Sequence, residues 1–157
     1  MKNTLTGFAF ALMIFVGMAF YAPSSAPETA AASARIHSYV SIVEIPANDL
    51  SRAVSFYQEV LGIKIEKMEF PGMEMGLFPY EEEMVTAVIM KGEGYEPSAK
   101  GATIYLNAGS DLQSALDKVK QNGGKILVPK TPHADESGFF ALFLDSEGNK
   151  LGLHSTN

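Results

Sequence analysis

The chain is 157 residues long, carries a formal net charge of -6 and contains no cysteine. Without cysteine it can have no disulfide framework, no thiolate zinc site and no lipid-modified cysteine anchor. The acidic balance and the lack of a Lys/Arg cluster argue against a nucleic-acid partner, because phosphate binding needs a concentrated basic face.

The N-terminus has the pattern of an export segment. Lys2 precedes an uncharged, mostly apolar run from Leu5 to Ala22, and an Ala/Ser/Pro-rich stretch follows. This run is close to the roughly 20 residues that span a bilayer, so a cleaved signal peptide and an uncleaved membrane anchor both stay open. The triplet 32–34 offers a cleavage site before Arg35. In either case we expect residues 1–34 to lie outside the fold, and the rest to be exported to the periplasm or another extracytoplasmic space. Only this segment would contact a membrane, if it is uncleaved.

Residues 35–157 are expected to form a single domain that contains an internal repeat. Four residues recur 62 positions later: Asp49, Leu50, Ala53 and Gly62 return as Asp111, Leu112, Ala115 and Gly124. Aspartate is a preferred helix N-cap and glycine a common helix stop. The repeat therefore predicts two helices, each with an apolar stripe that packs on a sheet.

Alternating apolar stretches, punctuated by Gly and Pro, predict strands before and after each helix. They lie at 38–46, 63–70, 72–78 and 84–91 in the first half, and at 101–108, 124–130, 137–145 and 149–155 in the second. We therefore predict an α+β fold of two tandem βαβββ modules, at about 38–93 and 101–155. The modules are expected to form one curved, barrel-like mixed sheet around a cavity, with the helices on the outside.

Three segments carry a resemblance to a known family: DLSRAVSFYQEVLG at 49–62, QNGGKILVPK at 121–130 and FLDSEGNKLGLHS at 143–155. Together they resemble the vicinal-oxygen-chelate superfamily, which includes glyoxalases, bleomycin resistance proteins and dioxygenases. The resemblance covers residues 38–155, and its most specific part is the D-x-E-G-N turn.

The resemblance implies a divalent ion in the metal-dependent members, held by one inward His or Glu on the first and last strand of each module. The corresponding positions here are Ile42, Thr103 and Gly152, together with Ile89 or Met90 on the fourth strand. None of these side chains is a competent ligand. We therefore expect no cofactor, with a divalent metal held by displaced residues as the alternative.

Strand alternation predicts a ligand pocket on the inward face. Its expected residues are Glu44, Thr103, Tyr105, Asn107 and His154. Glu44 and His154 each lie two residues beyond an empty ligand position. They could be solvated at the pocket mouth, form a buried structural pair, recognise a ligand or transfer a proton. We assign no catalytic residue.

The remaining histidines, the methionines, three phenylalanines and an acidic run were also considered as candidate functional residues. His37 and His133 are expected at the surface, because neither has a partner at ligand spacing. Five methionines of the first module suit either an adaptable pocket or core packing: Met68, Met73, Met75, Met84 and Met90. Phe139, Phe140 and Phe143 could stack on a ligand or fill the sheet interface. Glu81–Glu83 is expected to be a solvated turn.

The leading functional hypothesis is an exported, metal-independent protein that binds a small molecule for sequestration or sensing, as a monomer or a homodimer. The alternative is a metal-dependent enzyme, either a lactoylglutathione-lyase-like lyase or isomerase or a dioxygenase, with Glu44 and His154 as displaced ligands. A third hypothesis is an interaction module that uses an exposed sheet for oligomerisation.

Overall fold

Both predicted helices begin at their aspartate caps. In the computed structural model, which describes residues 40–80 and 86–157, α1 spans Leu50–Leu61 and α2 spans Leu112–Gln121. The Asp49 side chain accepts a hydrogen bond from the Arg52 amide, and Asp111 accepts from the amides of residues 113 and 114. Helix α1 stops at Gly62, whose positive φ of 67° suits glycine. The repeat therefore identified both helix starts correctly.

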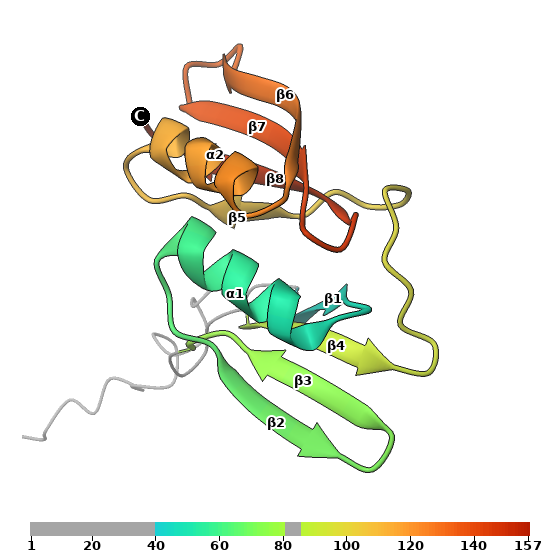
Figure 1. The fold of residues 1–157 in the computed structure, drawn as a ribbon. Coiled ribbons are helices and arrows are strands. Elements are labelled where there is room, and N and C mark those ends of the chain that lie inside the picture. Colours follow the sequence, from blue (N-terminus) through green and yellow to red (C-terminus); the bar gives the residue numbers. More distant parts are fainter. Residues whose placement is uncertain (1–39, 81–85) are drawn as a thin grey trace, which may run out of the picture. The chain divides into compact units, whose positions relative to one another are not determined.

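The strands complete two modules of the predicted order, strand, helix and three strands (Figure 1). In the first module they are β1 (Ile42–Pro46), β2 (Glu66–Phe70), β3 (Met73–Leu77) and β4 (Thr86–Gly92). In the second they are β5 (Tyr105–Asn107), β6 (Lys125–Pro132), β7 (Phe139–Leu144) and β8 (Lys150–Ser155). The predicted α+β class and the duplicated βαβββ order are confirmed.

The strands form two four-stranded mixed sheets, with no closed barrel among the described residues. Their orders are β1-β4-β3-β2 and β5-β8-β7-β6. The first and last strands of each module are parallel neighbours, and the other pairs are antiparallel. The single curved sheet that we expected is thus divided into two sheets, because hydrogen bonding joins β1 only to β4 and β5 only to β8.

One hydrophobic core serves both modules. Helices α1 and α2 contact each other, and the ring of Phe56 in α1 stacks on Phe143 of β7 with centroids 6.1 Å apart. Glycine lets the helices approach the sheets closely: a Cβ at Gly76 would lie 2.9 Å from Val54, and one at Gly124 would lie 2.9 Å from Phe56. The helices therefore cover one face of each sheet.

The face of each sheet opposite the helices is called the open face below. On the first sheet it carries Ile42, Met68 and Phe70, which are 61%, 38% and 49% exposed. Met68, Met75 and Met90 are direct neighbours across β2, β3 and β4 on this face. Met90 is nevertheless buried, at 4% exposed, whereas Met68 at the edge of the sheet is not.

The described strands and helices belong to a compact unit that spans His37–Asn157. The predicted export segment, His37, Glu81–Glu83 and Met84 lie outside the described residues. Within residues 40–80 and 86–157, no helix is long and apolar enough to span a membrane.

Candidate functional site

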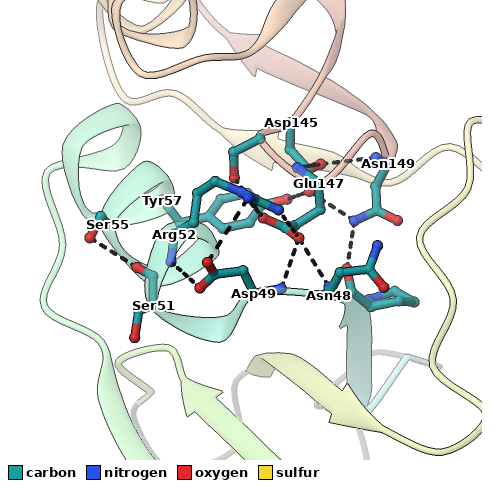
Figure 2. Close-up of polar contacts among 11 residues, drawn as sticks. Asn48, Asp49, Ser51, Arg52, Ser55, Tyr57, Asp145, Glu147 and Asn149 are labelled. Atoms are coloured by element: carbon teal, nitrogen blue, oxygen red, sulfur yellow. Dashed lines mark hydrogen bonds and ion pairs between the residues drawn. The ribbon is translucent and has the colours of Figure 1, made fainter.

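The D-x-E-G-N turn between β7 and β8 binds the first module through three side chains, Asp145, Glu147 and Asn149, which we call the clamp (Figure 2). The fully buried Glu147 side chain accepts hydrogen bonds from Nε and Nη2 of Arg52, at 2.7 and 2.9 Å, and from the amides of Asn48 and Asp49, both at 3.0 Å. These contacts fix the start of α1 against the second module.

The other two clamp residues extend this contact. Asp145 is buried and accepts a 2.6 Å hydrogen bond from the Tyr57 hydroxyl of α1. Burial, together with the Asp145 charge, raises the pKa of Tyr57 well above its usual value. The Asn149 side chain donates to the Pro46 carbonyl at the end of β1 and accepts from the Ser98 amide. The turn that carries the family resemblance is therefore a structural joint between the modules.

Electrostatics at the clamp favour an ionised Glu147. Burial raises the pKa of this carboxyl group, but the hydrogen bonds from Arg52 and from the Asp49 and Asn48 amides outweigh burial and lower it below the usual 4.5. The same ion pair raises the pKa of Arg52. All of these partners belong to the protein, so the ion pair holds the two modules together.

Three of the five predicted pocket residues lie together on the open face of the second sheet. Asn107 of β5 is the direct neighbour of His154 in β8, and Tyr105 is the neighbour of Gly152. They line a hollow of about 660 Å³, the His154 hollow. Its full lining is Tyr105, Asn107, Gly109, Ser110, His154, Ser155 and Thr156.

Thr103 and Glu44 lie elsewhere. Thr103 is half-buried and precedes β5, which is shorter than the predicted strand 101–108. Glu44 lines a separate hollow of about 280 Å³ with Lys100 and Lys150, and accepts a 3.3 Å hydrogen bond from the Tyr95 hydroxyl. Burial and the Glu44 charge raise the pKa of Tyr95. Within the part of the chain that the structure describes, no hydrogen bond or ion pair joins Glu44 to His154.

His133 is partly exposed, in keeping with the expected surface position, but its ring contacts two others that the sequence did not connect with it. Its ring centre lies 5.3 Å from that of His154 and 4.9 Å from that of Phe140. Phe140 also meets the Tyr105 ring edge-on at 6.4 Å. Four rings from β5, β7, β8 and the segment after β6 thus form one cluster beside the His154 hollow. No local pattern in the sequence indicates this cluster, because His133 and His154 meet only through the pairing of β7 with β8.

The family's usual metal positions do not fit a metal ion here. The direct neighbour of Tyr105 is Gly152, and a Cβ there would lie 2.2 Å from the Tyr105 ring, so the ring covers the last-strand position. Ile42 supplies no donor, Ile89 lies in the core, and Met90 has only a buried thioether, with the residue 4% exposed. Over residues 40–80 and 86–157, no three His, Asp or Glu side chains are grouped to hold an ion.

The duplicated βαβββ fold is that of a known superfamily, and comparison of the sequence with protein families identifies the same superfamily. Residues 35–153 match the Glyoxalase/Bleomycin resistance protein/Dioxygenase superfamily. A glyoxylase-like domain-containing protein of Didymella fabae is 33% identical over 122 residues, which are 73% of this chain and 91% of that protein. The chain belongs to this superfamily, as its resemblance predicted.

Other relatives include enzymes. A probable lactoylglutathione lyase of Synechocystis sp. is 27% identical over 127 residues, or 72% of this chain and 92% of that protein. Glyoxalase I from Zea mays is 26% identical with a TM-score of 0.59, over 73% of this chain and 45% of that enzyme. The chain thus spans less than half of the maize enzyme. A glyoxalase/bleomycin resistance protein from Albidiferax ferrireducens shares the fold at 21% identity and TM-score 0.58, over 73% and 96% of the two chains.

Proposed function

We propose that this protein is an exported binding protein that sequesters or senses a small molecule in the His154 hollow without a metal ion at the family's usual positions. The carrying observation is the arrangement around Gly152: Tyr105 covers the position of a metal ligand, while Asn107 and His154 lie beside it. An apolar ring with a few converging polar groups is the usual composition of a small-molecule site.

Binding to this hollow can be tested with residues 35–157 after treatment with a chelator. The fluorescent aromatic anion 8-anilinonaphthalene-1-sulfonate serves as the probe. We expect saturable binding that Tyr105→Ala and His154→Ala each weaken at least about fivefold, equivalent to about 1 kcal/mol. Tyr80→Ala is the matched control, because Tyr80 is exposed and lines a different hollow. Equal binding by all four proteins would rule out the His154 hollow as the site.

The enzyme alternative rests on the name of the Synechocystis relative. Its test is the formation or breakdown of lactoylglutathione by the chain, with and without added nickel or zinc. In that alternative Glu44 and His154 would be the displaced ligands. They line different hollows of one chain, so in this alternative a second copy would supply one of the two ligands. Metal-dependent turnover that Glu44→Ala abolishes would favour the enzyme.

Export is supported by Lys2, the apolar run from Leu5 to Ala22 and the small residues 32–34. Cell fractionation followed by N-terminal sequencing tests it. A mature chain that begins at Arg35 would indicate a cleaved signal peptide, and an intact chain in the membrane fraction would indicate an anchor. An intact chain in the cytosol would overturn the proposal of export.

A homodimer is part of the proposal. Exposed apolar side chains such as Ile42 and Phe70 lie on the open face of the first sheet, and Tyr105 lies on that of the second. Monomeric proteins rarely leave contiguous apolar patches uncovered. A second copy that covers these faces would also close the His154 hollow from water.

A further inference from the structure

We infer that His133 and His154 together form a binding site for a divalent transition-metal ion, separate from the family's usual metal positions. The two residues are far apart in the sequence, since one follows β6 and the other lies within β8. In the fold their ring centres lie 5.3 Å apart, with ring planes inclined at 47°.

This separation is compatible with one ion shared by the two rings. An ion about 2.0 Å from an imidazole nitrogen lies about 3.2 Å from the ring centre, so two rings at a tetrahedral angle of about 109° have centres about 5.2 Å apart. The observed 5.3 Å agrees with this value. Two ring nitrogens that face each other at this separation would hold one ion between them.

Both backbones are held in place by strand pairing. His154 lies in β8, between its neighbours Asn107 of β5 and Phe140 of β7. The His133 amide donates a 2.9 Å hydrogen bond to the Gly138 carbonyl across the loop that joins β6 to β7. The two backbone positions are consequently fixed before any ion arrives, which lowers the entropic cost of binding.

The ring nitrogens are available as ligands. Across residues 40–80 and 86–157, neither imidazole has a side-chain hydrogen bond or an ion pair, and both rings are only partly buried.

The chemistry of the donors selects the ion. Neutral imidazole nitrogens suit copper, nickel and zinc, whereas calcium and magnesium prefer oxygen ligands. With two protein ligands the ion keeps open positions, and the His154 hollow adjoins it through the His154 side chain. The inference does not depend on the proposed function, because a small molecule can occupy the hollow whether or not an ion is bound.

The experiment is calorimetric titration of the full chain with copper(II) and with nickel(II). We expect one ion per chain, copper bound more tightly than nickel, and a loss of affinity of at least about tenfold, or about 1.4 kcal/mol, in His133→Ala and in His154→Ala. The copper-loaded protein should give an electron paramagnetic resonance spectrum split by two imidazole nitrogens, which each single substitution reduces to one.

His37→Ala is the matched control, because His37 is the third histidine of the chain and should leave the affinity and the spectrum unchanged. Circular dichroism checks that each variant is folded. Copper bound equally by the double variant His133→Ala/His154→Ala, or no saturable binding by the unmodified chain, would overturn the inference. The anilinonaphthalene titration is repeated on the same variants with and without copper. Because it measures binding of a small molecule to the His154 hollow, it tests the proposed function separately from copper binding.

Discussion

At the scale of single residues, Glu147 combines a fully buried carboxylate with a partner, Arg52, whose side chain is half exposed. Charge-assisted hydrogen bonds are stronger than neutral ones, and here four of them converge on one side chain. Because the donors belong to α1 and its cap while Glu147 belongs to the second module, this residue couples helix formation to the packing of the modules.

Glu147→Gln should change how stability depends on pH. The folded-state pKa of Glu147 is lowered from 4.5, so its contribution is fully present above that value and is lost as the pH falls through the folded-state pKa. At pH 7 we expect the variant to be less stable by about 1–3 kcal/mol. Below pH 4.5 the difference should shrink as Glu147 of the unmodified protein becomes protonated.

Urea unfolding of residues 35–157 between pH 7 and pH 3 measures this difference. Glu59→Gln provides the control, since Glu59 is an exposed residue of α1 and its replacement should leave the pH profile unchanged. If the free energies of unfolding of Glu147→Gln and the unmodified protein differ by the same amount from pH 7 to pH 3, Glu147 is not ionised in the clamp.

At the scale of elements, the N-cap of α2 can be tested without disturbing the clamp. The Asp111 side chain accepts hydrogen bonds from two amides of the first turn, at 3.1 and 3.2 Å. Asp111→Ala leaves these amides without their protein acceptor and should lower the free energy of unfolding by about 1 kcal/mol. Asp117→Ala, an exposed change within the same helix, should have a smaller effect. If the two variants are equally stable, the Asp111 cap contributes nothing.

Local signals explain which elements could be predicted. Asp49, Asp111 and Gly62 act within a few residues of their own position, so the sequence alone located both helices. Strand β5 is shorter than its alternating pattern suggested. The segment before it is joined to β8 by isolated hydrogen bonds, such as that from the Gly152 amide to the Ile104 carbonyl. Alternation shows which residues are apolar, but it does not show at which residue the pairing of two strands begins.

The candidate site could not be predicted fully from the alternation of apolar residues, because it also depends on which strands pair and in which register. Asn107 and His154 are neighbours because the first and last strands of the module pair in parallel, and alternation alone did not specify that pairing. The contact between His133 and His154 requires the β7–β8 register and a β6 strand with two register shifts. Glu147 and Arg52 are 95 positions apart in the sequence. Neither contact has a local signal, so only the assembled fold revealed them.

At the scale of the whole molecule, both open faces carry exposed apolar side chains. Ile42 and Phe70 lie on that of the first sheet, and Tyr105 lies on that of the second. In a symmetric pair, the first sheet of each copy could pack on the second sheet of the other, which forms the same contact twice.

Phe70→Glu tests this arrangement. Phe70 is 49% exposed on the open face of the first sheet, so a carboxylate should be tolerated in a single copy but would be desolvated in a dimer. We expect light scattering to give the mass of a dimer for residues 35–157 and of a monomer for Phe70→Glu, with unchanged circular dichroism. Gln121→Glu adds the same charge at an exposed position of α2 and should stay dimeric. A monomer for the unmodified protein at every concentration would remove the dimer from the proposal and leave the His154 hollow open to solvent.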